Sequence, residues 1–235
     1  MNIEDYYNLE NSKLTFTRQQ ASDFAKHVAG DFNALHNIDT KRFCVPGDLL
    51  FSVIIHHYGL RQVMGFSFSD MVNDDTVLYL PEVKAREISI YDENNKKYLD
   101  VSTNGDLSHD TGLIESVTSS CVEFSGHSFP HVLVPLMKQH NTMVNTDRPL
   151  AIYDHMRIAL DTLDLDSVSL SVGECQFRVY GKRGDIALNF NFKCNGEVVG
   201  SGQKKMVIGG LREYDQSKID ILVNDYEGRK SAIDR

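Results

Sequence analysis

The sequence lacks the features that mark membrane, nucleic-acid-binding and zinc-binding proteins. Its 235 residues contain no run of about 18–20 apolar residues, the length that crosses a bilayer. Basic residues are scarce, 24 Lys and Arg against 33 Asp and Glu, and the net charge of −9 argues against a nucleic-acid partner, which needs clustered cations. The four cysteines form no C-x-x-C pair, which argues against a structural zinc site.

What is present is the profile of a soluble globular protein, with 41% hydrophobic and 24% charged residues. The length fits one large domain or two small ones. Residues 1–10 show neither a basic n-region nor an apolar h-region, so no signal peptide is expected there. We therefore expect a cytoplasmic protein with buried free thiols, no metal and no cofactor.

Two helices are predicted in the first sixty residues. Thr17 and Gln20 form a capping box before an amphipathic stripe that should end near Gly30. Pro46 and Gly47 open a second helix that is apolar on most sides, and such a helix is a buried one.

From residue 76 onward the sequence changes to strand-like segments separated by turns. Strands are predicted over 76–80, 85–91, 97–102, 115–124, 168–180, 186–194 and 197–208. A further helix is predicted from Asp147 to about Leu163, with Pro149 in its first turn, and the tail should be a surface helix or partly disordered. A helix followed by antiparallel strands thus occurs twice, which indicates an α+β fold with a curved sheet around a central helix. The chain divides into 1–126, 127–211 and a charged tail, 212–235.

One short segment carries candidate chemistry. Asp31, Asn33 and His36 follow Gly30 within seven residues. A carboxylate and an imidazole at this spacing can converge on a water molecule, one accepting a proton while the other donates one. The amide of Asn33 could orient either the imidazole or the water. In the alternative interpretation, Asp31 caps a short helical turn and His36 is a structural histidine.

Here the sequence resembles a known family. The matching segments are Leu14-Thr15-Phe16-Thr17, Phe24-Ala25 and Gly30-Asp31-x-Asn33-x-Leu35-His36. They resemble the hydratase 2 motif, G-D-x-N-P-[LIV]-H, of the MaoC-like (R)-specific enoyl-CoA hydratases and dehydratases. The resemblance implies a hot-dog fold, a catalytic pair of Asp31 and His36 supported by Asn33, and a Gly47 N–H that binds the thioester carbonyl. No second motif occurs in the C-terminal half, so a double hot-dog with a catalytically silent second half is expected.

The implied reaction is the reversible addition of water to a 2-enoyl thioester. Asp31 would deprotonate the water that attacks Cβ, His36 would protonate Cα, and the helix N-terminus would hold the enolate charge. The sequence departs from the family pattern at three places. Ala34 replaces a proline, Arg42 replaces a small residue, and Pro46-Gly47-Asp48 replaces His-Gly-Met/Leu. Asp48 suits the helix dipole but places a negative charge beside the developing enolate.

Two other functions stay open. One is a hot-dog thioesterase that uses Asp31 as its base, and the other is a non-catalytic protein that binds acyl thioesters or lipids. The expected partner is a thioester of coenzyme A or of an acyl carrier protein, with Lys41, Arg42 and Arg61 as candidate cations at the entrance. The Lys204-Lys205 pair is interpreted as solvated, and a homodimer is expected from exposed sheet edges and from the family.

Overall fold

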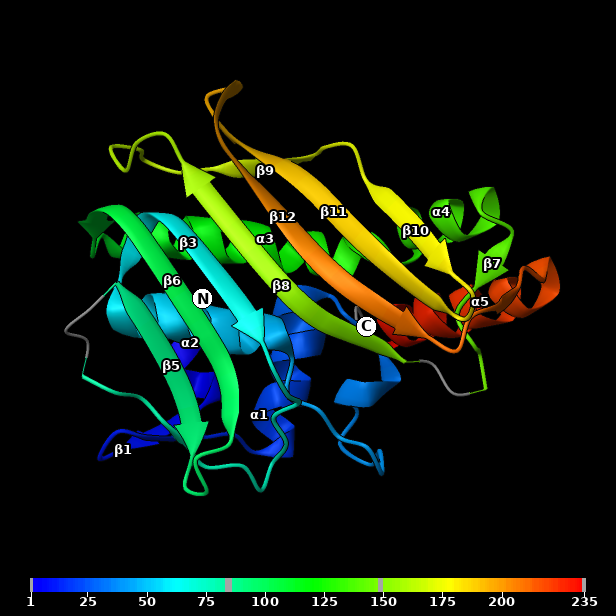
Figure 1. Cartoon of the computed structure of the whole chain (residues 1–235), viewed down its shortest axis with the longest axis horizontal. Coiled ribbons are helices and arrows are strands. Elements are labelled where there is room, and N and C mark those ends of the chain that lie inside the picture. Colours follow the sequence, from blue (N-terminus) through cyan, green and yellow to red (C-terminus); the bar gives the residue numbers. More distant parts are fainter. Residues whose placement is uncertain (1, 83–85, 148–149, 234–235) are drawn as a thin grey trace.

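A curved antiparallel sheet with helices on one face forms the molecule (Figure 1). The computed structural model describes residues 2–82, 86–147 and 150–233. Within these residues eleven strands form one sheet. Its order is β1 (Asn8–Glu10), β2 (Lys13–Thr15), β4 (Leu78–Tyr79), β5 (Glu87–Asp92), β6 (Lys97–Ser108), β3 (Leu60–Phe68), β8 (Ala151–Leu160), β12 (Glu197–Gly209), β11 (Arg183–Cys194) and β10 (Gln176–Tyr180), with β9 (Ser169–Val172) also on β11. A separate two-stranded sheet joins β7 (Thr142–Met143) to β13 (Arg212–Glu213).

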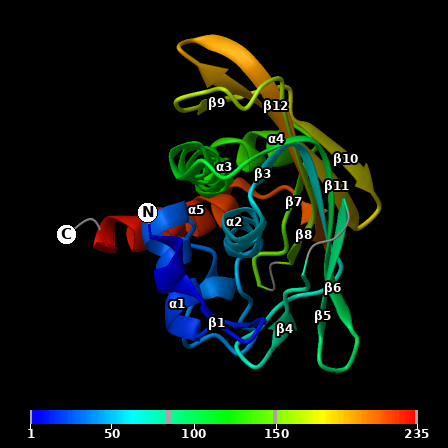
Figure 2. The ribbon, with the colours of Figure 1, turned by 90° about the vertical axis from the view of Figure 1, so that its left-hand side faces the viewer.

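Two long helices lie side by side on the inner face of the sheet (Figure 2). One packs against the first half of the sheet and the other against the second half. Helix α2 (Gly47–Tyr58) has its apolar residues fully buried, as expected for a helix that is apolar on most sides. Helix α3 (Thr111–His131) contacts α2 and strand β9. Strands β3 and β8 pair in the middle of the sheet and join the two halves. The fold is therefore a double hot-dog, α+β, as the sequence predicted.

The remaining helices are short, except the last. They are η1 (Ile3–Tyr6), α1 (Arg18–Asp23), the π-helix η2 (Phe24–Ala29), η3 (Ala34–His36), α4 (Leu133–Gln139) and α5 (Gln216–Ile233). The tail, predicted as a surface helix or partly disordered, forms helix α5, in which Ile219 and Tyr226 are buried. No helix among the described residues is both long and apolar enough to cross a bilayer.

The N-terminal capping box is confirmed by its two hydrogen bonds. The Gln20 backbone N–H donates to Thr17 Oγ1 at 3.1 Å, and the Thr17 N–H donates to Gln20 Oε1 at 3.0 Å. After α1 the helix widens into η2, and such π-turns are frequent at functional sites. It ends at Gly30, whose φ of 64° lies in the left-handed region that favours glycine. The chain then leaves the helix at the residue before Asp31.

Two predicted elements are wrong in type. Residues 115–124, predicted as a strand, lie in helix α3, and residues 151–160, predicted as helix, form strand β8. The physical reason is the spacing of the buried residues. In α3 they recur every three or four positions, at Leu113, Val117 and Cys121, whereas in β8 they alternate, at Met156, Ile158 and Leu160. Pro149 lies outside the described residues.

Other boundaries also differ from the prediction. Strand β3 was not predicted, and the predicted strand 168–180 is two strands, β9 and β10. The predicted boundary between the two halves of the chain, at residue 126, falls inside helix α3. The division into halves stays a prediction. All four cysteines are free, but only Cys121 is buried.

Candidate active site

The segment after η2 holds Asp31 and His36 through local hydrogen bonds. The Asp31 N–H donates to Ala25 O at 2.7 Å, which ties the residue to the end of the π-helix. Asp31 Oδ1 accepts the Asn33 N–H at 2.9 Å, and Asn33 Oδ1 accepts the Leu35 N–H at 3.1 Å as the N-cap of η3. Asn33 therefore supports the turn that carries His36.

The two ionisable side chains face each other. Asp31 Oδ2 lies 3.7 Å from His36 Nε2. His36 Nδ1 lies 2.7 Å from Cys44 O, and because a carbonyl oxygen can only accept, Nδ1 carries a proton and donates it there. This hydrogen bond fixes the ring so that Nε2 faces Asp31. Burial raises the pKa of Asp31, and the His36 charge and the Asn33 N–H offset that only in part.

These side chains lie in the wall of a cavity of about 670 Å³, a size typical of small-molecule sites. Asp31, Asn33, His36 and Gly47 all line it, so the structure brings together the four residues that the sequence singled out for catalysis and thioester binding. The rest of the wall is mostly apolar and includes Leu133, Met137, Val144, Leu150, Ile152, Leu188, Met206 and Ile208. Such a wall can hold an apolar chain next to the polar pair.

The start of helix α2 forms another part of the wall. Pro46 is its N-cap and provides no side-chain cap. No side chain therefore caps the first amide N–H groups of the helix, and the positive end of the helix dipole lies at Gly47 in the cavity wall. Tyr153 of β8 covers Gly47 so closely that a Cβ there would lie 2.4 Å from its Cδ1. Only glycine fits at this position without a shift of the ring.

Replacing Gly47 by Ala is expected to lower kcat by about 10- to 100-fold, since small misplacements at a reacting centre have effects of that size. The Tyr153 ring cannot move aside easily, because it stacks on Phe68 with centroids 4.7 Å apart. The added methyl would therefore displace the first turn of α2. Steady-state kinetics on the activity proposed below measures the effect, and a combined Gly47→Ala, Tyr153→Leu variant should recover part of it. An unchanged kcat in the single variant would contradict this packing role.

A second polar group in the cavity wall was missed by the sequence interpretation. Lys204, predicted to be solvated, is 2% exposed, and its Nζ lies 2.7 Å from Asp48 Oδ1. The signal was the alternation along β12, where Gly200, Gly202 and Ile208 are buried and share a strand face with Lys204.

The three cations predicted at the entrance do not line the cavity. Lys41 and Arg42 are exposed in a turn, and Arg61 donates to Gly105 O at 2.9 Å, beyond the C-terminal end of α2. In the part of the chain that the structure describes, the cations that line it are Lys204, paired with Asp48, and Arg229, paired with Asp225. For Arg61 the physical reason is the length of α2, which separates the Arg61 end of the helix from its Gly47 end by about 18 Å.

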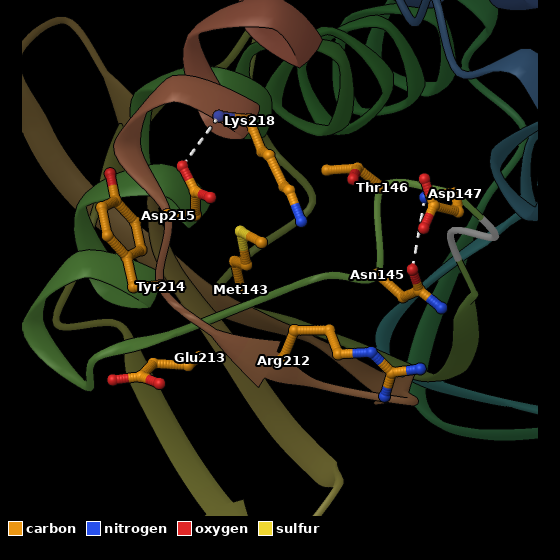
Figure 3. Close-up of a pocket in the computed structure, with 9 residues that line it drawn as sticks. All are labelled: Met143, Asn145, Thr146, Asp147, Arg212, Glu213, Tyr214, Asp215 and Lys218. Atoms are coloured by element: carbon orange, nitrogen blue, oxygen red, sulfur yellow. Dashed lines mark hydrogen bonds between the residues drawn. The ribbon is translucent and has the colours of Figure 1, made fainter.

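A smaller pocket of about 360 Å³ lies beside the cavity and shares Thr146 with it (Figure 3). It lies at the β7–β13 pair and the start of α5. Its acidic residues, Asp147, Glu213 and Asp215, outnumber Arg212 and Lys218. One carboxylate is already engaged, because Asp215 accepts the Lys218 backbone N–H at 3.2 Å. The balance of charge in this pocket does not favour an anion.

Comparison with known proteins gives the family. The chain belongs to the DUF3581 family, described as a protein of unknown function, whose model matches residues 1–217. No curated protein matches the sequence significantly.

Solved structures with a similar chain trace include an acyl-CoA thioesterase II of Mycobacterium marinum, with 11% sequence identity and a TM-score of 0.41. The match covers 92% of this chain and 98% of the thioesterase chain. A MaoC-like dehydratase has 8% identity, coverage of 87% and 98%, and a TM-score of 0.42. A conserved hypothetical protein of Mycobacterium tuberculosis, described as having a double hot-dog fold, has 10% identity, coverage of 81% and 88%, and a TM-score of 0.39. Similarity this low says nothing about the reaction, so the proposed function rests on the cavity.

Proposed function

We propose that the protein catalyses the reversible hydration of a 2-enoyl thioester to a 3-hydroxyacyl thioester. The observation that supports this most directly is the separation of 3.7 Å between Asp31 Oδ2 and His36 Nε2 in the wall of a largely apolar cavity. A base and an acid at this distance can act on one water and one double bond. The uncapped start of α2 lies in the same wall.

The proposed step balances its protons within this pair. Asp31 takes a proton from water as the water oxygen bonds to Cβ, and the π electrons of the double bond move through Cα to the thioester oxygen. The Gly47 N–H stabilises that oxygen. His36, as an imidazolium, donates its Nε2 proton to Cα. The proton on Asp31 then passes to Nε2, which restores both groups.

The carrier is proposed to be coenzyme A or an acyl carrier protein. Among the described residues, the two cations of the cavity wall, Lys204 and Arg229, are already paired with carboxylates. The acyl chain and the thioester should therefore contribute most of the binding, through the apolar wall.

The test is turnover of crotonyl-CoA and of longer trans-2-enoyl-CoA substrates. Hydration removes the ultraviolet absorbance of the conjugated thioester without releasing a thiol, whereas hydrolysis releases free coenzyme A, which a thiol reagent detects. We expect loss of absorbance and no thiol. Release of thiol from saturated acyl-CoA would replace the proposal by the thioesterase function. Acyl-CoA binding with neither reaction would replace it by the binding function.

The rate of hydration should fall at acid pH. The base must be ionised, and burial raises the pKa of Asp31 above its ordinary value of 3.8. Activity is therefore present above the raised pKa and is lost as the pH falls through it. The pH profile of kcat/KM should place the midpoint of the acid limb above pH 3.8. A limb at or below that value would contradict Asp31 as the base.

A further inference from the structure

The buried cation of the cavity wall has no free proton for a substrate. Lys204 Nζ donates to Asp48 Oδ1 at 2.7 Å and to Cys121 O at 2.6 Å, and it also contacts Ser125 Oγ. An ammonium group has three protons, and three acceptors surround this one. Lys204 comes from the second half of the sheet, whereas Asp48 belongs to the first turn of α2. The ion pair therefore connects the two halves at the start of the central helix.

Asp48 alone would oppose the proposed chemistry. It lies one residue after Gly47, and its carboxylate is buried, with 12% of the side chain exposed. A negative charge at this point reduces the positive potential that the helix N-terminus offers to a developing oxyanion. In a buried site the effect of a neighbouring charge is large, and so is the effect of a counter-ion in direct contact.

We propose that Lys204 is a positioning residue for the hydration reaction, an inference that rests on the proposed function. Its ammonium group, held by Cys121 O and Ser125 Oγ of helix α3, neutralises Asp48. The amide of Gly47 then keeps its positive potential. Lys204 acts only through Asp48 and does not touch the substrate.

The charges around Asp31 fit this role. The groups that act on its carboxyl are His36 on η3, Asp48 on α2 and Lys204 on β12, and Tyr226 on α5 interacts with it as well. Asp48 raises the pKa of Asp31 and Lys204 lowers it. An unpaired Asp48 would therefore lower the ionised fraction of Asp31 at a given pH and weaken the oxyanion site.

The experiment compares Lys204→Met, Asp48→Asn and the double variant with the wild type, after wild-type hydration has been established. Lys204→Met is expected to lower kcat by about 10- to 100-fold with a smaller change in KM, the effect of a weakened oxyanion site. The double variant removes both charges, and removing a whole buried pair is better tolerated than removing one partner. It should recover kcat to within about 5-fold of the wild type, because the two residues act as one coupled unit.

A ¹³C-detected titration of the Asp31 carboxyl gives a readout that does not need turnover. The pKa of Asp31 should rise in Lys204→Met and return toward the wild-type value in the double variant. If Lys204→Met does not fold, the double variant decides alone. A kcat of the double variant near that of the wild type supports the inference. A loss of more than about 10-fold overturns it, because Lys204 would then act directly. Absence of wild-type hydration would instead refute the proposed function.

Discussion

Replacing Asp31 by Asn is expected to lower kcat/KM for hydration of an enoyl thioester by about 10²- to 10⁴-fold, the usual contribution of a positioned general base. The amide has nearly the same shape as the carboxylate and keeps an oxygen that can accept the Asn33 N–H, so the turn that carries His36 should persist. What is lost is the ability to take a proton from water. Initial rates followed by ultraviolet absorbance measure the effect.

The matched control is Asp70→Asn, the same chemical change in the same cavity wall. Asp70 pairs with Lys96 at 2.6 Å on an exposed part of the surface and does not contact His36 within ion-pair distance. Its loss should change kcat/KM by less than about 3-fold, since exposed ion pairs contribute little. Equal losses in both variants, or activity in Asp31→Asn close to that of the wild type, would exclude Asp31 as the base.

The candidate site was predicted from a short local segment together with its resemblance to the hydratase 2 motif. The capping box at Thr17 and the glycine at position 30 act within a few residues, so their effect can be predicted from spacing alone. Asp31, Asn33 and His36 are likewise held by hydrogen bonds that span two to eight residues. The buried helix from Gly47 was predictable because its sequence is apolar on most sides.

Segments whose type depends on the tertiary structure were predicted less well. Residues 115–124 include the β-branched Val117, Thr118 and Val122, which favour strands, yet packing against α2 keeps the segment helical. Strand β8 contains apolar residues that also fit a helical stripe, but pairing with β3 and β12 on both sides holds it extended. In both segments tertiary contacts decided the outcome, with helix α2 in one and with the neighbouring strands in the other.

The ion pair of Asp48 and Lys204 shows the same limit at the site. The two residues are 156 positions apart, and each alone has an ordinary interpretation, one as a helix-dipole charge and the other as a solvated lysine. Their contact depends on β12 lying next to β8 and presenting Lys204 to the inner face. A double hot-dog fold is needed before this contact can be foreseen.

Replacing Gly126 by Ala is expected to destabilise the protein by about 3 kcal/mol, at the upper end of the usual effect of overpacking. A Cβ at this position on α3 would lie 1.7 Å from Ala29 O and 2.8 Å from Ala29 C. These are backbone atoms at the end of the π-helix, directly before Gly30 and Asp31, so no side chain can rotate away. Equilibrium unfolding in urea, followed by circular dichroism, measures the change in the free energy of unfolding.

The same substitution at Gly228 is the matched control, because it is also in a helix and no atom lies within 4 Å of its added Cβ. There Ala should stabilise the protein by up to about 1 kcal/mol, the difference in helix propensity. The Gly126→Ala variant should also lose activity, since Tyr226 Oη donates to both Gly30 O and Gly126 O at 2.9 Å and would lose one or both bonds. Normal stability and activity in Gly126→Ala would show that α3 does not position Asp31.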